Sequence, residues 1–358
     1  MQTAYAPGRV ELLGNHTDYN EGYVLSAAID RGITVSGSVT GDDQVRLHSR
    51  DLGRRYETRL GGLTPEREQE WVNYPLGVLK VFVQEGLPVA GVEVEIAGNL
   101  PLGAGLSSSA ALEVSTGKLL EKLFALELDP LRLARLCRRA ENEFVGVNCG
   151  LLDQVSSVFG REDHVIFLDC REETVRTTPL PPGVSLLITE CGVPHRLSGG
   201  EYNERREQCF DAAARLGARA LRDVSRGQLE AGRNAMPELS YRRALHIVGE
   251  NERVLAGIAA LERGDVEAFG ALMSRSHESS RLHFENSTPE LDALVAIASG
   301  LPGVLGARLT GGGFGGATVT LVRSGQSQAV AQALRERYHE QTGHTATVHH
   351  CRAAEGAR

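Results

Sequence analysis

A loop rich in glycine and serine, "PLGAGLSSS" at residues 101–109, offers the clearest chemistry in this sequence. It follows a strand pattern and precedes a helix, so the six backbone N–H groups from Gly103 to Ser108 converge on the start of that helix. The first four N–H groups of a helix lack intrahelical partners and carry partial positive charge, which suits a phosphate. The loop alone leaves three interpretations open: a flexible loop whose serines cap the helix, a dinucleotide site, and the triphosphate loop of a kinase.

Details of this segment argue against a dinucleotide site of the Rossmann type. The preceding strand, "VEVEIAG" at residues 92–98, alternates valine or isoleucine with polar positions, whereas the first strand of a doubly wound sheet is buried on both faces. Pro101 also separates that strand from the glycines. The Walker pattern GxxxxGK[ST] is absent too, because no lysine follows the glycines. The loop therefore predicts phosphate binding without naming the ligand.

Two carboxylates lie in apolar surroundings further along the chain. Glu141 falls at the edge of the apolar stripe of a helix that begins at Pro130, and Asp153 lies within "CGLLDQVSSVF". A carboxylate in such a position needs a cation or a hydrogen-bond donor. Taken singly, an ion pair with Arg138 or Arg139 explains Glu141. Asp153 is either a helix cap or a carboxylate kept for chemistry.

Two more polar or glycine-rich segments lie beside apolar runs. "GNHTDYN" at residues 14–20 groups an amide, an imidazole, a hydroxyl, a carboxylate and a phenol between "VELL" and "YVLSAAI". Such a group is either an ordinary polar turn or a set of hydrogen-bonding partners for a ligand. "TGGGFGG" at residues 310–316 precedes the alternating "ATVTLV", and by itself it predicts a glycine-rich hairpin turn.

The elements that must position these groups mix strands and helices in both halves, which indicates an α+β fold. Short strands are expected over residues 9–39 ("YVLSAAID" and "GITVSGSV" being the clearer pair), 183–192 and either side of the glycine turn, with "ATVHHC" as the last; helices are expected over 108–124, "PLRLARLCRRAENEFVG", 203–219 and 241–300. After the turn-forming "PLPPG" we place a domain boundary, giving an N-terminal domain at 1–182 and a C-terminal domain at 183–358.

Composition excludes several classes of function. Hydrophobic residues make up 41% and charged residues 23%, as in soluble globular proteins. The net charge of -8 predicts no nucleic-acid surface, and no apolar run reaches the roughly 18 residues of a membrane helix. The six cysteines show no paired or metal-binding spacing, and the N-terminus lacks a signal-peptide pattern. We therefore expect reduced thiols in a cytoplasmic protein that acts as a monomer on small molecules.

Read together, three segments resemble the three ordered motifs of the GHMP kinase superfamily. They are "PGRVELLGNHTDYNEGYVL" (7–25), "PLGAGLSSSAALEV" (101–114) and "GARLTGGGFGGATVTLV" (306–322), and the first is similar to the galactokinase signature. "AENEFVGVNCGLLDQ" (140–154) and "EYNERREQC" (201–209) also resemble galactokinase segments. The resemblance spans nearly the whole chain in order. Its motifs occur jointly, which the separate cap, ion-pair and flexible-loop explanations would not predict.

The resemblance implies a fold, a reaction and roles for particular residues. The fold would be a domain like domain 2 of ribosomal protein S5 followed by a ferredoxin-like domain, with the active site between them. The reaction would be Mg²⁺-dependent transfer of the γ-phosphate of ATP to the C1 hydroxyl of D-galactose. Asp153 would accept or orient the hydroxyl proton, and Arg9 would offset charge at the γ-phosphate. Ser109 and Glu141 would hold Mg²⁺. Further contacts would be Gly103, Ala104, Gly105, Leu106, Ser107, Ser108 and Ser109 to ATP, and Asn15, His16, Asp18, Gly150 and Tyr202 to the sugar.

The first motif departs from the commonest family form, "GRVNLIGEHTDYN". Glu11 stands where asparagine is usual, and Asn15 stands where a glutamate usually binds the sugar's outer hydroxyl. A neutral amide makes a weaker hydrogen bond to a hydroxyl than a carboxylate does. Galactose stays the expected substrate, with galactosamine, N-acetylgalactosamine and L-arabinose as alternatives. "GNHTDY" argues against a mevalonate- or homoserine-type acceptor, and the intact "GLSSSA" with Arg9 and Asp153 argues against a non-catalytic sugar sensor.

Overall fold

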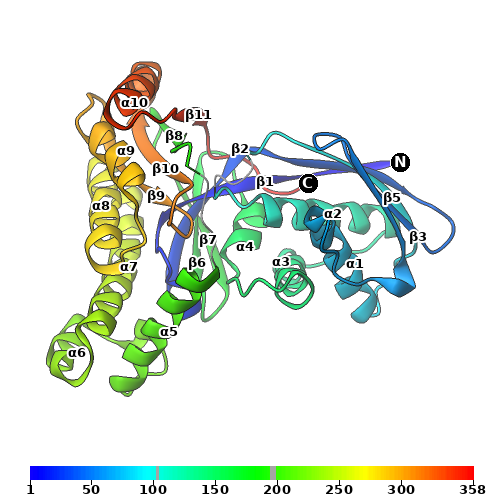
Figure 1. Ribbon diagram of the computed structural model, residues 1–358, viewed down its shortest axis with the longest axis horizontal. Coiled ribbons are helices and arrows are strands. Elements are labelled where there is room, and N and C mark those ends of the chain that lie inside the picture. The colour runs from blue at the N-terminus through cyan, green and yellow to red at the C-terminus, as the bar shows by residue number, and fades with distance from the viewer. Residues whose placement is uncertain (102–104, 194–198) are drawn as a thin grey trace.

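A computed structural model describes residues 1–101, 105–193 and 199–358 (Figure 1). In this part of the chain the first sheet has seven strands in the order β4-β3-β5-β2-β6-β7, with β1 paired to β2. The strands are β1 (Gln2–Leu13), β2 (Tyr23–Val39), β3 (Gln44–Ser49), β4 (Arg54–Arg59), β5 (Val92–Gly98), β6 (His164–Asp169) and β7 (Thr174–Pro179). All neighbours are antiparallel except β3 and β5.

The second sheet has four antiparallel strands in the order β11-β8-β10-β9 over the described residues. They are β8 (Val184–Glu190), β9 (Val304–Thr310), β10 (Ala317–Arg323) and β11 (Thr347–Cys351). Helices separate β8 from β9 and β10 from β11, which gives the β-α-β-β-α-β connectivity of a ferredoxin-like unit. The predicted α+β fold is therefore confirmed.

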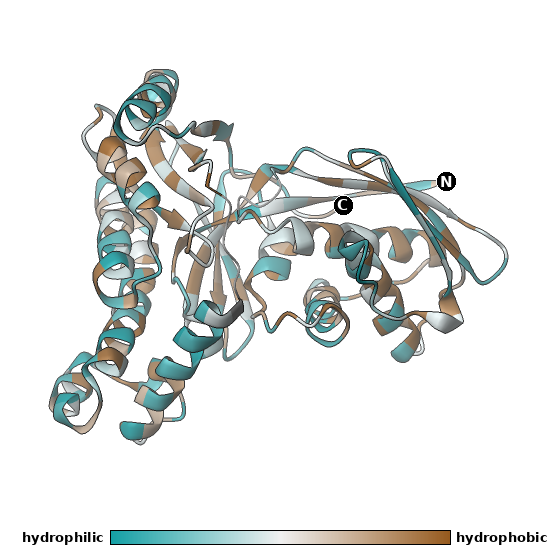
Figure 2. Ribbon diagram, in the orientation of Figure 1, coloured by the Kyte–Doolittle hydropathy of each residue, from teal (hydrophilic) through white to brown (hydrophobic). Residues whose placement is uncertain are grey.

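Helices pack on both sheets. On the first sheet lie α1 (Asn73–Gln84), α2 (Ser108–Phe124), α3 (Pro130–Arg139) and α4 (Leu152–Phe159), and on the second lie α8 (Val266–Ser279), α9 (Pro289–Ser299) and α10 (Ser327–Thr342). The long helix α7 (Glu238–Glu262) contacts β1, β2 and β7 of the first sheet and packs against α8, and α5 (Gly199–Arg215) and α6 (Arg226–Ala231) pack against α7. Figure 2 shows α5 mainly hydrophilic. No helix of the described residues is long and apolar enough to cross a membrane, and all six cysteines are free thiols.

The two ends of the chain meet on the first sheet. Tyr5 and Arg358 exchange two backbone hydrogen bonds, at 2.8 and 2.9 Å, and the Ala354 N–H donates to the Ala28 carbonyl. Strands of the first sheet come from residues 2–179 and strands of the second from residues 184–351. The last residues therefore return to the first sheet, and the domain boundary at residue 182 stays a prediction.

Several predicted elements are confirmed, and two are corrected. The helix over 108–124 and the strand over 92–98 have the predicted bounds. The two strands expected within residues 23–39 are wrong, because β2 is one continuous strand of 17 residues. Gly32 lets this strand lie close to β1, since a Cβ there would be 2.3 Å from the Ala6 carbonyl oxygen. The helix from Pro130 also changes character: α3 ends at Arg139, and a wider π-helix, η4, covers Ala140–Val145.

Candidate active site

The site residues predicted from sequence, as far as the structure describes them, line one cavity of about 530 Å³. They are Arg9, Asn15, His16, Asp18, Gly105, Leu106, Ser107, Ser108, Ser109, Glu141, Gly150, Asp153 and Tyr202. Gly103 and Ala104 lie outside the described residues. The cavity also has lining that was not predicted, chiefly Glu11, Tyr74 and Cys149, and it includes Gly311 and Gly312 of "TGGGFGG", the segment that the family resemblance places beside the active site.

Asp153, in the first turn of α4, is held on both carboxylate oxygens. Arg9 of β1 places its Nε and Nη2 atoms each 2.8 Å from Asp153 Oδ1. The Ser107 hydroxyl donates to Asp153 Oδ2 at 2.5 Å. The Asp153 side chain keeps 24% exposure while that of Arg9 has 7%. Asp153 is therefore an oriented carboxylate open to the cavity, not a helix cap.

The serine loop is fastened to β1 by Arg9. Arg9 Nη1 donates to the Gly105 carbonyl at 2.6 Å, and the Arg9 backbone N–H donates to the Leu106 carbonyl at 3.1 Å. The expectation that serines cap the helix is wrong for Ser107, which has a left-handed backbone (φ 57°) and makes no side-chain cap. Its hydroxyl serves Asp153 instead. The first N–H groups of α2 consequently lack this capping partner, and Ser108 and Ser109 line the cavity, as a phosphate site at this helix end requires.

Glu141 lies in the π-helix η4 and is almost fully buried. Arg138 and Arg139, its predicted ion-pair partners, contact Glu173, Glu85 and Glu143 instead. Gln154 Nε2 donates to Glu141 Oε2 at 2.7 Å. Burial, followed by the charge of Asp153, raises the pKa of Glu141, while hydrogen bonds from Cys149, Ser109 and Gln154 oppose that shift.

Glu113 extends this carboxylate cluster and was not predicted. It is fully buried one helical turn after Ser109, and Gln154 Nε2 donates to its Oε2 at 3.0 Å. Burial and the charge of Glu141 raise the pKa of Glu113 well above its ordinary value. A sequence signal existed, because Glu113 is a carboxylate on the apolar face of α2. Its function could not be recognised without knowing that Gln154 bridges it to Glu141.

His16 is a neutral group that lines the cavity and is held by hydrogen bonds on both ring nitrogens. Its Nε2 lies 2.9 Å from the Gly312 carbonyl, which can only accept, so Nε2 carries the proton and Nδ1 accepts from the Tyr19 hydroxyl at 2.8 Å. Burial lowers the pKa of His16 to about 4. The Tyr202 and Phe284 rings pack against the imidazole at 5.0 and 4.6 Å between centroids. These contacts give the loop a fixed aromatic wall.

Asp18 and Gly150, two predicted sugar contacts, lie against each other. A Cβ at position 150 would be 2.2 Å from Asp18 Oδ2, so this close approach requires glycine. Burial raises the pKa of Asp18 to about 6, and the nearby Asp153 charge adds to the shift. Asp18 therefore presents a poorly solvated carboxyl beside the catalytic candidate Asp153.

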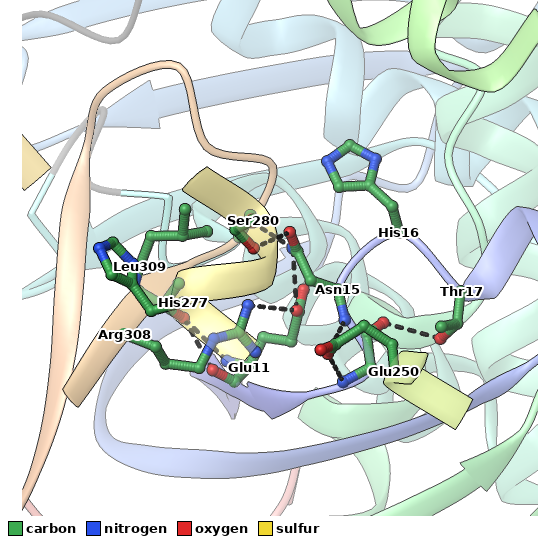
Figure 3. A network of polar contacts seen from close by, with 12 residues as sticks. Glu11, Asn15, His16, Thr17, Glu250, His277, Ser280, Arg308 and Leu309 are labelled. Atoms are coloured by element: carbon green, nitrogen blue, oxygen red, sulfur yellow. Dashed lines mark hydrogen bonds and ion pairs between the residues drawn. The ribbon is translucent and has the colours of Figure 1, made fainter. Parts of the chain in front are cut away.

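Glu250 of α7 supports the backbone of the first motif, a contact that the sequence did not predict. Glu250 is fully buried and accepts hydrogen bonds from the backbone N–H groups of Gly14 and Asn15, at 2.8 and 3.0 Å (Figure 3). Arg253 Nε donates to the other oxygen at 2.5 Å. Burial favours the neutral acid, but Arg253, His246 and the other donors outweigh it and lower the pKa of Glu250. No local pattern separates Glu250 from other helical glutamates, because its partners are about 235 residues away.

Family models match three segments of the chain. The description "GHMP kinases N terminal domain" matches residues 73–161, "GHMP kinases C terminal" matches residues 258–340, and "Galactokinase galactose-binding signature" matches residues 2–39. The matches contain the serine loop, Glu141, Asp153 and the first motif.

Curated relatives match along almost the whole chain. A galactokinase of Roseiflexus sp. (strain RS-1) is 45% identical over 98% of this chain and 91% of its own length. A galactokinase of Haemophilus influenzae (strain PittEE) is 43% identical over 99% of this chain and 94% of its own.

Solved structures agree with the sequence relatives. A Lactococcus lactis galactokinase, crystallised with galactose, superimposes with a TM-score of 0.96 at 33% identity, covering 100% of this chain and 94% of that one. A mevalonate kinase of Methanococcus jannaschii reaches a TM-score of 0.69 at 19% identity over 99% and 98% of the two chains, and shares the fold.

Proposed function

The chain belongs to the galactokinase family of the GHMP kinases, and we propose that it transfers the γ-phosphate of ATP to the C1 hydroxyl of D-galactose. The products are galactose 1-phosphate and ADP. One observation carries the assignment of roles: Asp153, Arg9 and Ser107 form a bonded unit between the serine loop and the first motif. The match to the galactose-binding signature favours galactose over galactosamine, N-acetylgalactosamine and L-arabinose.

Asp153 orients the C1 hydroxyl and accepts its proton. Oδ1 is taken by Arg9, and Oδ2 keeps a lone pair beyond its bond with Ser107. Arg9 holds this carboxylate in place through Oδ1 and offers positive charge to the negative charge that develops during phosphoryl transfer. Such transfer depends mainly on positioning and charge neutralisation, which these fixed groups provide.

The start of α2 binds the phosphates of ATP. Its N–H groups and the loop N–H groups donate to phosphate oxygens. Arg9 bonds both to the Gly105 carbonyl of the loop and to Asp153, and so fixes the position of the loop relative to Asp153. Gly103 and Ala104 belong to the same proposed contact set. The proposed ATP contacts therefore belong to one loop and one helix end.

Ser109 and Glu141 suit a magnesium ion. The described residues contain no group of three or more His, Cys, Asp or Glu side chains that could hold a metal by themselves. Mg²⁺ commonly takes one or two carboxylates and completes its shell with phosphates and water. Glu141 fits because it is buried, held by Gln154, and paired with no arginine or lysine among the described residues. Bound there, Mg²⁺ would neutralise charge on the β- and γ-phosphates.

Asn15, His16, Asp18, Gly150 and Tyr202 form the proposed sugar wall. His16 and Tyr202 give it an apolar stacking face, and the Asp18 carboxyl accepts from sugar hydroxyls. The monomeric state and the cytoplasmic location expected from the sequence stay predictions.

The experiment is a coupled ADP-release assay over a panel of sugars, with Asp153→Asn as the test variant. We expect galactose to give the highest kcat/KM in the wild type. Loss of a positioned proton acceptor lowers kcat by about 10²–10⁴-fold, while ATP binding persists. Retained turnover in Asp153→Asn would refute its role, and a different preferred sugar, or a mevalonate or homoserine acceptor, would refute the substrate.

A further inference from the structure

Glu11 is a buried carboxylate on the cavity wall. Its side chain has 5% exposure, and it lines the same cavity as Asp18 and Asp153. Glu11 Oε1 accepts from Asn15 Nδ2 at 3.0 Å and lies 3.1 Å from Arg308 Nη2 (Figure 3). Arg308, on β9, is fully buried, and Glu11 is its ion-pair partner among the described residues. The pair therefore fixes a carboxyl group at one point of the wall.

The neighbouring Asn15 amide has no hydrogen-bonding capacity left for a ligand. Its Nδ2 donates to Glu11 Oε1 and, at 2.8 Å, to the Gly311 carbonyl. Its Oδ1 accepts from Asn286 Nδ2 at 2.8 Å and from the Ser280 hydroxyl at 3.5 Å. An amide has two donor hydrogens and two acceptor lone pairs, so all four positions are in use. Asn15 thus joins Glu11 to the glycine loop and cannot itself take a sugar hydroxyl without breaking one of these bonds.

Glu11 has the capacity that Asn15 lacks. Its Oε2 accepts no hydrogen bond within the described residues, whereas Oε1 has two partners. Because Glu11 lines the cavity, a hydroxyl group of a ligand can donate to this oxygen. Burial, opposed by Arg308, Arg9 and Asn15, raises the pKa of Glu11 to about 7, which reflects this incomplete solvation.

We infer that Glu11 is a specificity-determining residue whose Oε2 accepts a hydrogen bond from one non-anomeric hydroxyl of the sugar, with Asn15 and Arg308 as positioning residues. The inference rests on the proposed function. The exchange of glutamate and asparagine at positions 11 and 15 leaves one carboxyl group and one amide in contact, so the carboxyl acceptor is moved within the site and not lost. An amide at position 15 therefore does not remove the carboxyl acceptor from this part of the wall.

The test pairs Glu11→Gln with the 2-, 3-, 4- and 6-deoxy derivatives of galactose. In the wild type, removing the contacted hydroxyl raises KM by about 10- to 100-fold, the effect of a hydrogen bond to a charged group. Glu11→Gln raises KM for galactose to a similar extent, with kcat nearly unchanged. The decisive result is coupling: the penalty for that same deoxy sugar falls to about two- to threefold in Glu11→Gln. Equal penalties in both proteins for every deoxy sugar would overturn the inference.

A reciprocal exchange separates binding from folding. Glu11→Asn and Asn15→Glu are made singly and together, and the double variant is expected to recover at least about tenfold in kcat/KM over either single variant. The inference would be overturned if the kcat/KM of the double variant were no higher than the product of the two single effects predicts. This test does not depend on whether Glu11→Gln folds. Glu93→Gln, on the exposed face of β5, is the matched control. Failure of the wild type to phosphorylate galactose at all would instead refute the proposed function.

Discussion

Replacing Glu250 by glutamine tests whether α7 positions the sugar-binding loop. The wild-type carboxylate accepts from Gly14 and Asn15 through one oxygen and from Arg253 through the other. Every one of these partners is a donor. A glutamine side chain has one NH₂ group, so in either orientation that group faces a donor and one set of bonds is lost.

The magnitude follows from burial. Glu250 has no exposure and Arg253 has 14%, so the variant leaves a largely desolvated guanidinium or two unsatisfied backbone N–H groups. Removing one partner of a buried ion pair costs about 3–5 kcal/mol. For a domain of the size of either half, a loss of about 3 kcal/mol lowers Tm by about 6–12 °C. Because the loop at Gly14 and Asn15 loses its support, KM for galactose rises while KM for ATP changes little.

Differential scanning fluorimetry and steady-state kinetics measure both effects. Glu252→Gln is the control, since Glu252 lies on the same helix, is 51% exposed and pairs with Arg226; such a surface pair is worth about 0–1 kcal/mol.

The stability that Glu250 contributes depends on pH with a definite sign. The folded-state pKa of Glu250 is lowered, so its stabilisation is present above the unfolded pKa near 4.5 and is lost as pH falls below it. The Tm gap to Glu250→Gln should narrow in acid. A variant as stable as Glu252→Gln, with unchanged galactose KM, would refute this reasoning.

Three further predictions use the same assays. Ser107→Ala removes a donor from Asp153 and should lower kcat by about 10- to 100-fold, the value of one hydrogen bond to a charged group, with Tm nearly unchanged; a normal kcat would contradict its positioning role. Gly150→Ala should raise galactose KM more than ATP KM, because the new Cβ would lie 2.2 Å from Asp18 Oδ2; an unchanged KM would show that Asp18 moves freely. The raised pKa values of Asp18, about 6, and Glu11, about 7, mean that the folded ligand-free protein binds extra protons, so their contribution to stability falls as pH rises from about 5 to 7. The Tm profile of Asp18→Asn should therefore be flatter there than that of the wild type, and identical slopes would contradict the assignment.

Local sequence determined the elements that hold the phosphate loop. The alternation in "VEVEIAG" and the helical stripe after Ser108 are period-2 and period-3.6 signals, and both elements have the predicted bounds. The prediction was wrong where the backbone conformation depends on a neighbouring strand. The second of the two expected strands began at Gly32, but the strand continues through this residue, and the glycine allows close contact of β1 and β2. The spacing of apolar residues did not predict the π-helix that contains Glu141.

Residue types, their order and the resemblance to the GHMP kinase motifs predicted which side chains form the site, and those that the structure describes line one cavity. Only the tertiary structure decided their pairing. Ser107 bonds to Asp153, Gln154 joins Glu113 to Glu141, and Glu250 holds the loop of the first motif. The physical reason is that hydrogen bonds and ion pairs act over about 3 Å in space, and these partners are 13 to 236 residues apart in sequence. Period and composition contain no information about such contacts. The exchange at Glu11 and Asn15 is visible in the sequence, but only the fold shows that the two side chains touch.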